Sequence, residues 1–376
     1  MQTSPSHGTY FMKINGTSFR SVWVDEKDLW SIHIFDQTRL PFSLDILRLT
    51  TVQDVAHAIT SMQVRGAPLI GAVAAYGLAL ALRTDSSDTS LEQNAAMLAA
   101  TRPTAINLRW ALERMLNALR PIPPENRVSA AYTEAQHICD EDAAQNEAIG
   151  RHGLKLLQDI SGKKEKGQRL NILTHCNAGW IATVDWGTAL APIYMAHDLG
   201  LNVHVWVDET RPRNQGAALT AWELGSHGVP HTVITDNAGG HIMQHGQVDI
   251  VIVGTDRVTR NGDVANKIGT YLKALAAQDN KIPFWVALPS TTIDWRIADG
   301  IRDIPIEERA ASEVTHVQGR MPDGKIGSVQ ITPDHSTAAN PAFDVTPSRL
   351  VTGLITEKGC CPATENGLLT LFPDHK

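Results

Sequence analysis

Residues 248–256 read VDIVIVGTD, and this stretch decides the fold class. Positions 250–253 are four consecutive β-branched residues, which give way directly to Gly254, Thr255 and Asp256. So short a run with apolar residues on both faces is typical of a strand in a parallel sheet that helices cover on both sides. We therefore expect a buried strand that ends at a polar turn.

The rest of the C-terminal half alternates in the same way between short apolar runs and helical patterns. The other apolar runs are LNILTH (170–175), VHVWVDE (203–209), HTVITD (231–236) and PFWVALP (283–289). Segments with apolar residues three and four positions apart lie between them, at 186–200, 216–228, 239–246 and 267–278. This alternation predicts an α/β domain with a mostly parallel sheet, whose ligands bind at the carboxyl ends of the strands.

The N-terminal half has a different pattern. RSVWVDEKDLWSIHIFDQTRL (20–40) alternates apolar and polar residues around the turn-like DEKD, which predicts a hairpin. Helical spacing then continues from Ser43 to about Gln158. The most polar stretch in the middle of the chain, SGKKEKGQR, is interpreted as a linker. The expected division is an N-terminal hairpin and helical domain, a linker and a C-terminal α/β domain, at 1–160, 161–169 and 170–376.

Composition narrows the classes of partner. The 376 residues carry a formal net charge of −7, which argues against nucleic acid because a phosphate backbone needs a concentrated basic surface. Charged or glycine positions interrupt the long apolar runs, and the N-terminus lacks the basic start of a secretory signal, so we expect no membrane association and a cytoplasmic location. The four cysteines include no CxxC pair, which makes a disulfide framework or a structural zinc site unexpected.

Polar residues follow several of the predicted strands, and they are candidates for a common site. Cys176 lies between His175 and Asn177 after the first strand. A lone cysteine is more often a small buried residue than a reactive one. At the mouth of a strand, near amides and arginines, its thiolate would be favoured, and this position leads us to prefer a functional role.

Asp256 is the candidate proton donor, because a carboxylate after so apolar a strand would be partly desolvated and its pKa raised. An Asp that caps the next segment or pairs with Arg257 is the structural alternative. Asp208 and Glu209 are rivals for the acid role, although Glu209 is easily interpreted as the partner of Arg211.

Asn266 and Lys267 are expected to open a helix. A lysine there opposes the helix dipole unless an anion is also bound, which favours a ligand. The HIMQH segment (241–245) lacks the glutamate and the third ligand of a zinc site, so no metal is expected. The GAPLIG segment (66–71) opens like a phosphate loop but lacks its Lys and Ser/Thr, and no GxGxxG follows a strand, so nucleotide binding is poorly supported.

The stretch VRGAPLIGAVAAYGLAL (64–80) has the features of an anion site at a helix start. Pro68 suits the first turn, Gly66 allows close approach of a ligand, and Arg65 lies beside the free amides of Gly66 and Ala67. Arg102 likewise precedes a proline and a helix. For both arginines a plain junction between a loop and a helix is the alternative interpretation.

Six motifs together resemble the methylthioribose-1-phosphate isomerase family, which is related to the regulatory subunits of the eukaryotic translation-initiation exchange factor. The resemblance extends from about Val22 to about Gly359. The motifs are MQVRGAPLIG (62–71), RPTAINL (102–108), LTHCNAG (173–179), VDETRPRNQGA (207–217), GTDRVTRNGDVANKIGTY (254–271) and NPAFDVTP (340–347). The resemblance implies a Rossmann-like C-terminal domain, a homodimer and a reaction that needs no cofactor.

The resemblance also implies residue roles. The catalytic cysteine of the family corresponds to Cys176 and its proton-donating aspartate to Asp256. The implied substrate-binding residues are Arg65, Gly66, Ala67, Arg102, Gln215, Asn266 and Lys267. The implied reaction is isomerisation of the aldose 5-methylthioribose 1-phosphate to a ketose, with Cys176 as a base or a stabiliser of the transition state.

Three alternatives stay open at this point. A related isomerase would act on ribose 1,5-bisphosphate or 5-deoxyribose 1-phosphate. A regulatory subunit would sense sugar phosphates without converting them. A metal-dependent hydrolase is the third and weakest alternative.

Overall fold

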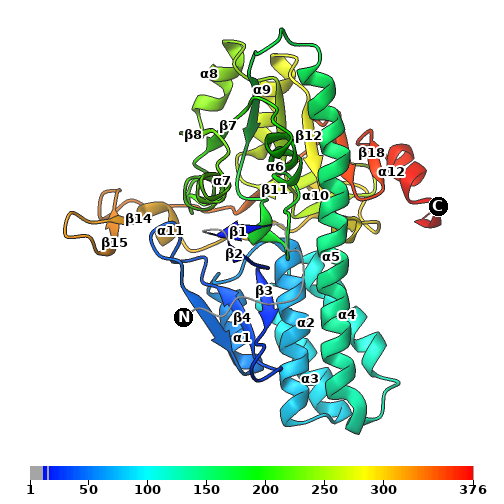
Figure 1. Ribbon diagram of the computed structural model, residues 1–376. Helices are drawn as coiled ribbons and strands as arrows, with labels where there is room; N and C mark the ends of the chain where they lie inside the picture. Colours follow the sequence, from blue (N-terminus) through cyan, green and yellow to red (C-terminus); the bar gives the residue numbers. More distant parts are fainter. Residues whose placement is uncertain (1–11, 15–16, 376) are drawn as a thin grey trace.

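The computed structural model describes residues 12–14 and 17–375, and it is an α/β protein (Figure 1). A seven-stranded sheet forms the C-terminal half, with the order β18-β17-β12-β9-β6-β7-β8. Every neighbouring pair in it is parallel except β17 with β18. The mostly parallel sheet is therefore confirmed. Its strands are β6 (Leu170–Thr174), β7 (Val203–Asp208), β8 (His231–Ile234), β9 (Ile250–Val253), β12 (Phe284–Ala287), β17 (Gly353–Thr356) and β18 (Gly359–Cys361).

The order of the strands creates a switch point at β6. From β6 the chain proceeds to β7 and β8 on one side, and then continues with β9, β12 and β17 on the other. Ile172 of β6 accordingly pairs with both Val205 and Ile250. In open α/β sheets, ligands bind in the crevice where the strand order reverses, outside the carboxyl ends of the strands. Here that crevice lies beyond the ends of β6 and β9.

Helices connect these strands, as the apolar periodicity predicts. They are α6 (Ala191–Asp198), the π-helical turn η2 (Gly216–Thr220) with α7 (Ala221–His227), α8 (Ala238–Gln244) and α9 (Thr270–Asp279). Short elements complete this half: η1 (Trp180–Ala182), η3 (Ser290–Thr292), α10 (Gly300–Asp303), α11 (Ser312–Thr315), η4 (Ser348–Leu350), α12 (Glu365–Leu371) and η5 (Pro373–His375). The hairpin of β14 (His316–Arg320) and β15 (Ile326–Gln330) projects from the body as an arm (Figure 1).

A second, four-stranded sheet lies beside the first and corrects one expectation. It consists of β13 (Ile293–Asp294), β10 (Arg257–Thr259), β11 (Val264–Lys267) and β16 (Phe343–Thr346). Asn266 and Lys267 were expected to open a helix, but they are the last residues of β11, and α9 begins only at Thr270. The reason is pairing on both sides, because β11 is hydrogen-bonded to β10 and to β16.

The predicted N-terminal hairpin is confirmed as β3 (Val22–Val24) with β4 (Ile32–Phe35). The carboxylate of Asp28 in its turn accepts bonds from the backbone amides of Trp30 and Ser31. A third strand, β5 (Ile46–Leu49), pairs with β4, so the helical region begins later than the expected Ser43. A shorter pair, β1 (Lys13–Ile14) and β2 (Thr17–Ser18), precedes them.

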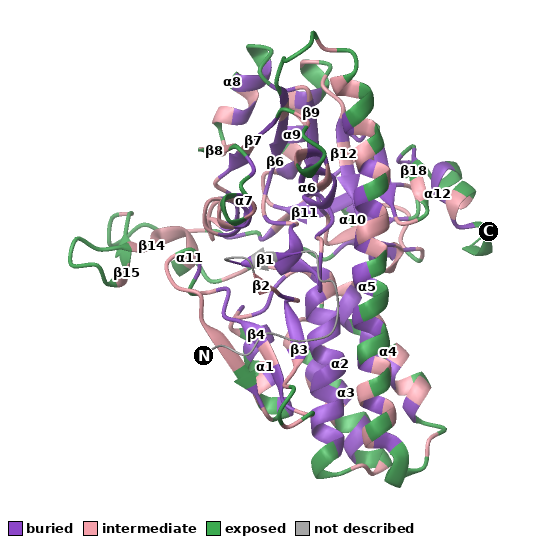
Figure 2. Cartoon of the chain, viewed as in Figure 1, coloured by how far each residue is buried: buried purple, intermediate pink, exposed green. Residues whose placement is uncertain are grey.

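Five helices follow: α1 (Val52–Thr60), α2 (Ala67–Thr84), α3 (Asp88–Thr101), α4 (Ile106–Leu119) and α5 (Pro124–Ser161). Among the helices of the described residues, α2 alone is long and apolar enough to span a membrane, which corrects the expectation that no apolar run is long enough. However, 83% of it is buried inside the protein, and Figure 2 shows it as a buried helix between its neighbours. Its apolar character is that of a core helix.

The helix α5 spans the long dimension of the molecule, from the N-terminal helices to the seven-stranded sheet (Figure 1). It approaches α6 closely at Gly153. A Cβ at this position would lie 2.8 Å from Cβ and 2.9 Å from Cγ of Pro192. The segments on either side of 161–169 also share a core, in which the ring of Phe35 lies 5.6 Å from that of Trp180. The N-terminal hairpin is therefore anchored directly beside the loop that follows β6.

The contact at Gly153 predicts a specific loss of stability. Because a proline ring cannot rotate away, Gly153→Val should lower the free energy of unfolding by about 1–3 kcal/mol. Lys155→Val on the exposed side of the same helix is the control and should cost only a few tenths of a kcal/mol. Urea unfolding of both variants measures the difference. Equal stability of the two variants would contradict the close packing of α5 against α6.

Candidate functional site

A cavity lies at the switch point, beyond the carboxyl ends of β6 and β9. The structure brings all nine predicted site residues to it, although they come from segments up to 202 positions apart, Arg65 to Lys267. They are Arg65, Gly66, Ala67, Arg102, Cys176, Gln215, Asp256, Asn266 and Lys267. The residues Met62, Ile70, Pro289 and Phe343 give the cavity an apolar portion.

Cys176 is the second residue after β6, and its backbone is in the left-handed region with φ 65°. Such a conformation is uncommon for a residue with a side chain and persists where its surroundings hold it. Three hydrogen bonds do so here. The Cys176 amide donates to Oγ1 of Thr210 at 2.8 Å, its carbonyl accepts from Oγ1 of Thr220 at 2.7 Å, and its thiol donates to Oε1 of Gln215 at 3.5 Å.

The protonation state of Cys176 differs from the expectation. Burial raises the pKa of its thiol above the ordinary value, and the nearby charges of Arg65 and Lys267 oppose this shift without overcoming it. The prediction that position alone favours the thiolate is therefore wrong for the protein without ligand. Desolvation at the bottom of the cavity outweighs the two cations.

Asp256 comes three residues after the end of β9, and its amide donates to the carbonyl of Ala265 at 3.0 Å. Burial raises the pKa of its carboxyl, with Lys267 and Arg102 opposing the shift, so the predicted direction is confirmed. The raised pKa favours the protonated acid. Oδ2 of the rival Asp208 instead lies 2.9 Å from Nδ1 of His175, behind the cavity.

Arg65 joins the N-terminal half to the loop that carries Cys176. Its side chain is only 4% exposed, and it donates to Oδ1 of Asn177 at 2.8 Å and to the Asn177 carbonyl at 3.0 Å. Asn177 in turn donates to Oε1 of Glu223 at 2.7 Å. The other Glu223 oxygen accepts from the Trp180 amide and the Tyr194 hydroxyl. Burial nevertheless dominates and raises the pKa of Glu223 to about 7.

The start of α2 forms one wall of the cavity. Gly66 is the N-cap with φ 94°, and a Cβ there would lie 2.3 Å from the carbonyl oxygen of Ala182. Only glycine fits this combination of conformation and close approach. The amides at the beginning of a helix have no carbonyl partner within it, so those of Gly66 and Ala67 are placed to bind an anion.

Two further cations, Lys267 and Arg102, line the cavity from other parts of the chain. The ammonium group of Lys267 lies 4.3 Å from the centre of the Phe343 ring, its partner in the β11–β16 register. Asn266 donates to Oγ1 of Thr270 at 3.0 Å. Arg102 donates to Oε2 of Glu307 at 3.0 Å, while its Nε is buried without a hydrogen-bond partner among the described residues.

The charges of the cavity point to an anionic ligand. Within the part of the chain that the structure describes, neither Arg65 nor Lys267 forms an ion pair with a carboxylate, although both side chains are buried. A buried and unpaired charge is costly unless a ligand of opposite charge completes the pair. Together with the amides at the start of α2, these cations can hold a phosphate.

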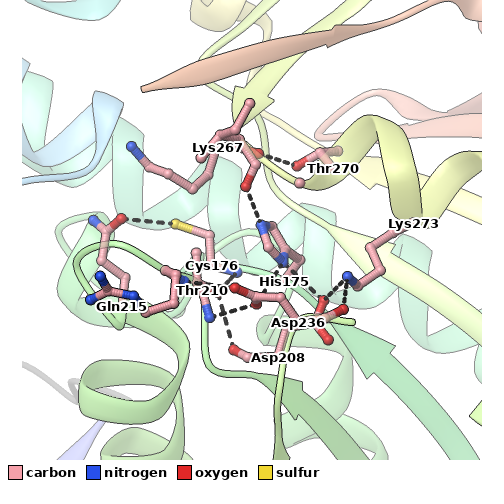
Figure 3. A network of polar contacts seen from close by, with 12 residues as sticks. His175, Cys176, Asp208, Thr210, Gln215, Asp236, Lys267, Thr270 and Lys273 are labelled. Atoms are coloured by element: carbon pink, nitrogen blue, oxygen red, sulfur yellow. Dashed lines mark hydrogen bonds and ion pairs between the residues drawn. The ribbon is translucent and has the colours of Figure 1, made fainter. Parts of the chain in front are cut away.

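Behind Cys176 lies a network of polar contacts (Figure 3). His175, Asp208 and Asp236 offer three atoms close enough to bind a metal ion. However, the ammonium group of Lys273 lies 3.3 Å from Oδ2 of Asp208 and donates to the carbonyl of Asp236, so it supplies the positive charge that the carboxylates need. This arrangement explains the cluster without a metal.

Sequence reasoning missed several residues that shape the site. Asn177 and Glu223 hold Arg65, Glu307 holds Arg102, and Phe343 underlies Lys267. Asn177 and Phe343 lie inside motifs that were already singled out by resemblance. Glu223 and Glu307 lie outside them, and only the folded chain brings them into contact.

Comparisons with known proteins show the family to which the chain belongs. Residues 63–363 match the model of the Initiation factor 2 subunit family. A methylthioribose-1-phosphate isomerase from Gluconobacter oxydans (strain 621H) is 70% identical over 364 residues, 97% of this chain and 99% of that protein. One from Acidiphilium cryptum (strain JF-5) is 69% identical, over 97% and 98% of the two chains.

Two solved structures cover 95% of this chain, each at 40% identity. The 5-methylthioribose 1-phosphate isomerase from Pyrococcus horikoshii OT3 has a TM-score of 0.81 and is covered over 96% of its length. The translation initiation factor eIF-2B subunit delta from A. fulgidus has a TM-score of 0.77 and is covered completely, at 100%. Proteins named as isomerases and proteins named as initiation-factor subunits therefore share this fold.

The raised pKa of Glu223 predicts a dependence of stability on pH. Between the ordinary value of 4.5 and the folded value of about 7, the folded protein binds the proton that the unfolded chain has lost. The contribution of Glu223 to the free energy of unfolding is therefore fully present below pH 4.5. It declines as pH rises toward 7, by up to about 3 kcal/mol. Glu223→Gln removes the effect. The stability of the native protein minus that of the variant, measured by urea unfolding, should fall across this window. A difference that does not change with pH would contradict the burial of Glu223.

Proposed function

Because this chain belongs to the Initiation factor 2 subunit family and, within it, to the methylthioribose-1-phosphate isomerases, we propose that it isomerises 5-methylthioribose 1-phosphate to 5-methylthioribulose 1-phosphate. One observation carries the proposal. Arg65 and Lys267 line the same cavity as Cys176 and Asp256, at the switch point of the sheet. Both cations are buried and have no carboxylate partner among the residues that the structure describes.

The phosphate of the substrate binds at the start of α2. Its oxygens accept hydrogen bonds from the amides of Gly66 and Ala67 and from the guanidinium groups of Arg65 and Arg102. Gln215 and Asn266 bind the sugar hydroxyls, and the positive charge of Lys267 faces the phosphate. The apolar residues Met62, Ile70 and Phe343 on the cavity wall suit a 5-methylthio group better than a second phosphate.

Asp256 donates the proton that opens the ring. The phosphate on the anomeric oxygen blocks the spontaneous ring opening of ordinary aldoses, so the bond between C1 and the ring oxygen must be broken with acid assistance. The ring oxygen takes the proton and becomes the 4-hydroxyl. The pKa of Asp256, raised by burial, favours the acid form that this step requires.

A hydrogen then moves from C2 to C1 as C2 becomes the carbonyl. The 2-hydroxyl passes its proton to the Asp256 carboxylate, which gave up its own proton in ring opening. The hydrogen moves either as a proton through an enediolate-like intermediate or directly as a hydride. Cys176 serves as the base in the first route and stabilises the transition state in a dry pocket in the second. The pKa of its thiol, raised by burial, means that a role as base requires loss of the thiol proton after the substrate binds. Substrate and product are isomers, and the reaction involves no net oxidation or reduction, so no cofactor is required.

The substrate assay is the first test. Purified protein should convert 5-methylthioribose 1-phosphate to the ketose, and it should prefer this sugar to 5-deoxyribose 1-phosphate and ribose 1,5-bisphosphate. A preference for the bisphosphate would replace the proposed substrate by the related one. Absence of turnover with all three would favour the regulatory subunit as the alternative function, and loss of activity after chelation would favour a metal-dependent enzyme.

Two conservative substitutions test the proposed roles. Cys176→Ser and Asp256→Asn should each reduce kcat by at least about 100-fold, because each removes a group that acts in the transition state. Circular dichroism and thermal unfolding should show that both variants remain folded. Cys360→Ser, at an exposed thiol, is the matched control and should retain activity. Turnover near the native rate in either site variant would remove that residue from the mechanism.

The homodimer and the cytoplasmic location also remain proposals. Light scattering of the purified protein measures the oligomeric state, and the mass of a single 41.0 kDa chain would contradict the homodimer.

A further inference from the structure

His175, the residue before Cys176, is a fully buried imidazole with both ring nitrogens facing acceptors. Nδ1 lies 2.9 Å from Oδ2 of Asp208, and Nε2 lies 2.8 Å from the carbonyl oxygen of Ile268 (Figure 3). A carbonyl oxygen only accepts, so Nε2 carries a hydrogen and donates it to Ile268. A second hydrogen lies between Nδ1 and the Asp208 carboxyl. Although His175 borders the cavity, neither nitrogen is left to bind a substrate.

The two partners of His175 belong to different parts of the site. Asp208 ends β7, the neighbour of the strand that carries Cys176. Ile268 directly follows Asn266 and Lys267 at the end of β11. The imidazole therefore connects the Cys176 segment to the segment that presents Lys267, across the boundary between the two sheets.

The backbone around the imidazole is shaped to admit it. Gly269 has φ 104°, and a Cβ at this position would lie 2.9 Å from Cε1 of His175. On the other side of the ring, Lys273 contacts Asp208 and fixes the carboxylate that His175 uses. Both the glycine and the lysine belong to the turn into α9 or to α9 itself. Gly269 thus leaves room for the imidazole of His175, and Lys273 holds its partner Asp208 in place.

The left-handed backbone of Cys176 is held by hydrogen bonds from the same polar network that contains His175 and Asp208. Its own amide is held by Thr210, whose amide is in turn held by Oδ1 of Asp236 at 2.8 Å. His175 is the side chain within this network that also contacts the Lys267 segment. Loss of the imidazole would release Cys176 relative to Lys267 while leaving the start of α2 unchanged.

We propose that His175 is a positioning residue, which holds the Cys176 thiol in register with Lys267 through Asp208 and the Ile268 carbonyl. The part of the proposal that concerns turnover rests on the proposed function. The placement of the thiol itself does not, because it can be measured without a substrate.

Steady-state kinetics separate positioning from binding. His175→Ala should lower kcat by about 100-fold, the cost of a displacement of about 1 Å at a reacting group, and should change KM by less than about threefold because the phosphate site is intact. His175→Gln should recover part of kcat, since its amide N–H reaches toward the Ile268 carbonyl. His204→Gln is the matched control, because His204 is buried on β7 and contacts Thr232 away from the cavity. Its kcat should equal the native value.

Alkylation of Cys176 by iodoacetamide tests the placement of the thiol. At a fixed pH of about 8, near the ordinary thiol pKa, release of the partly buried thiol should accelerate its alkylation at least about fivefold in His175→Ala. Alkylation of Cys360, followed on its own peptide by mass spectrometry, should not change. Asp208→Ala removes the other end of the contact, and Asp208 does not line the cavity. This variant replaces His175→Ala in the test if His175→Ala does not fold.

Two results would overturn the proposal. The first is a folded His175→Ala or Asp208→Ala variant with native kcat and native alkylation of Cys176. The second is a loss of activity that lies entirely in KM. If the native protein converts none of the sugars, the proposed function fails while the alkylation result still decides whether His175 holds the thiol.

Discussion

The hydrogen bonds between the guanidinium group of Arg65 and Asn177 join the two halves of the protein at the site. Arg65 precedes the buried helix α2, and Asn177 follows Cys176 at the end of β6. Because the contact is buried, it requires the start of α2 to lie against the switch point of the sheet. Every other site residue comes from a segment that reaches this junction.

The electrostatics of the cavity follow from desolvation. Burial raises the pKa of Cys176 and of Asp256 and lowers that of Lys267, so it acts against the charged form of each. A phosphate would reverse this balance for the cations, because it supplies the negative charge that they lack. Binding of the anion would therefore offset the cost of burying these cations.

Much of this arrangement can be predicted from the sequence. The β-branched run of β9 and the periodicity of the helices indicate the parallel sheet, and the rule about strand ends places Cys176 and Asp256 at one edge. The family resemblance adds Arg65 and Lys267. What sequence reasoning cannot provide are contacts set by pairing between distant strands. The register of β11 with β16 turns Lys267 into a strand residue over Phe343, where helical periodicity had indicated a helix start. Burial likewise reversed the expected protonation of Cys176, since the depth of a thiol in the cavity depends on the whole fold.

The shared fold does not separate an isomerase from an initiation-factor subunit, because solved structures with both names match this chain at 40% identity. In the proposed function, the pair of Cys176 and Asp256 opposite an anion site is what makes the difference. The most direct test is a crystal structure with 5-methylthioribulose 1-phosphate bound. The account predicts phosphate oxygens on the amides of Gly66 and Ala67 and on Arg65, with C1 and C2 about 3–3.5 Å from Cys176 or Asp256. A sugar phosphate bound in the separate groove beside Arg213 and His316, with the switch point empty, would contradict it.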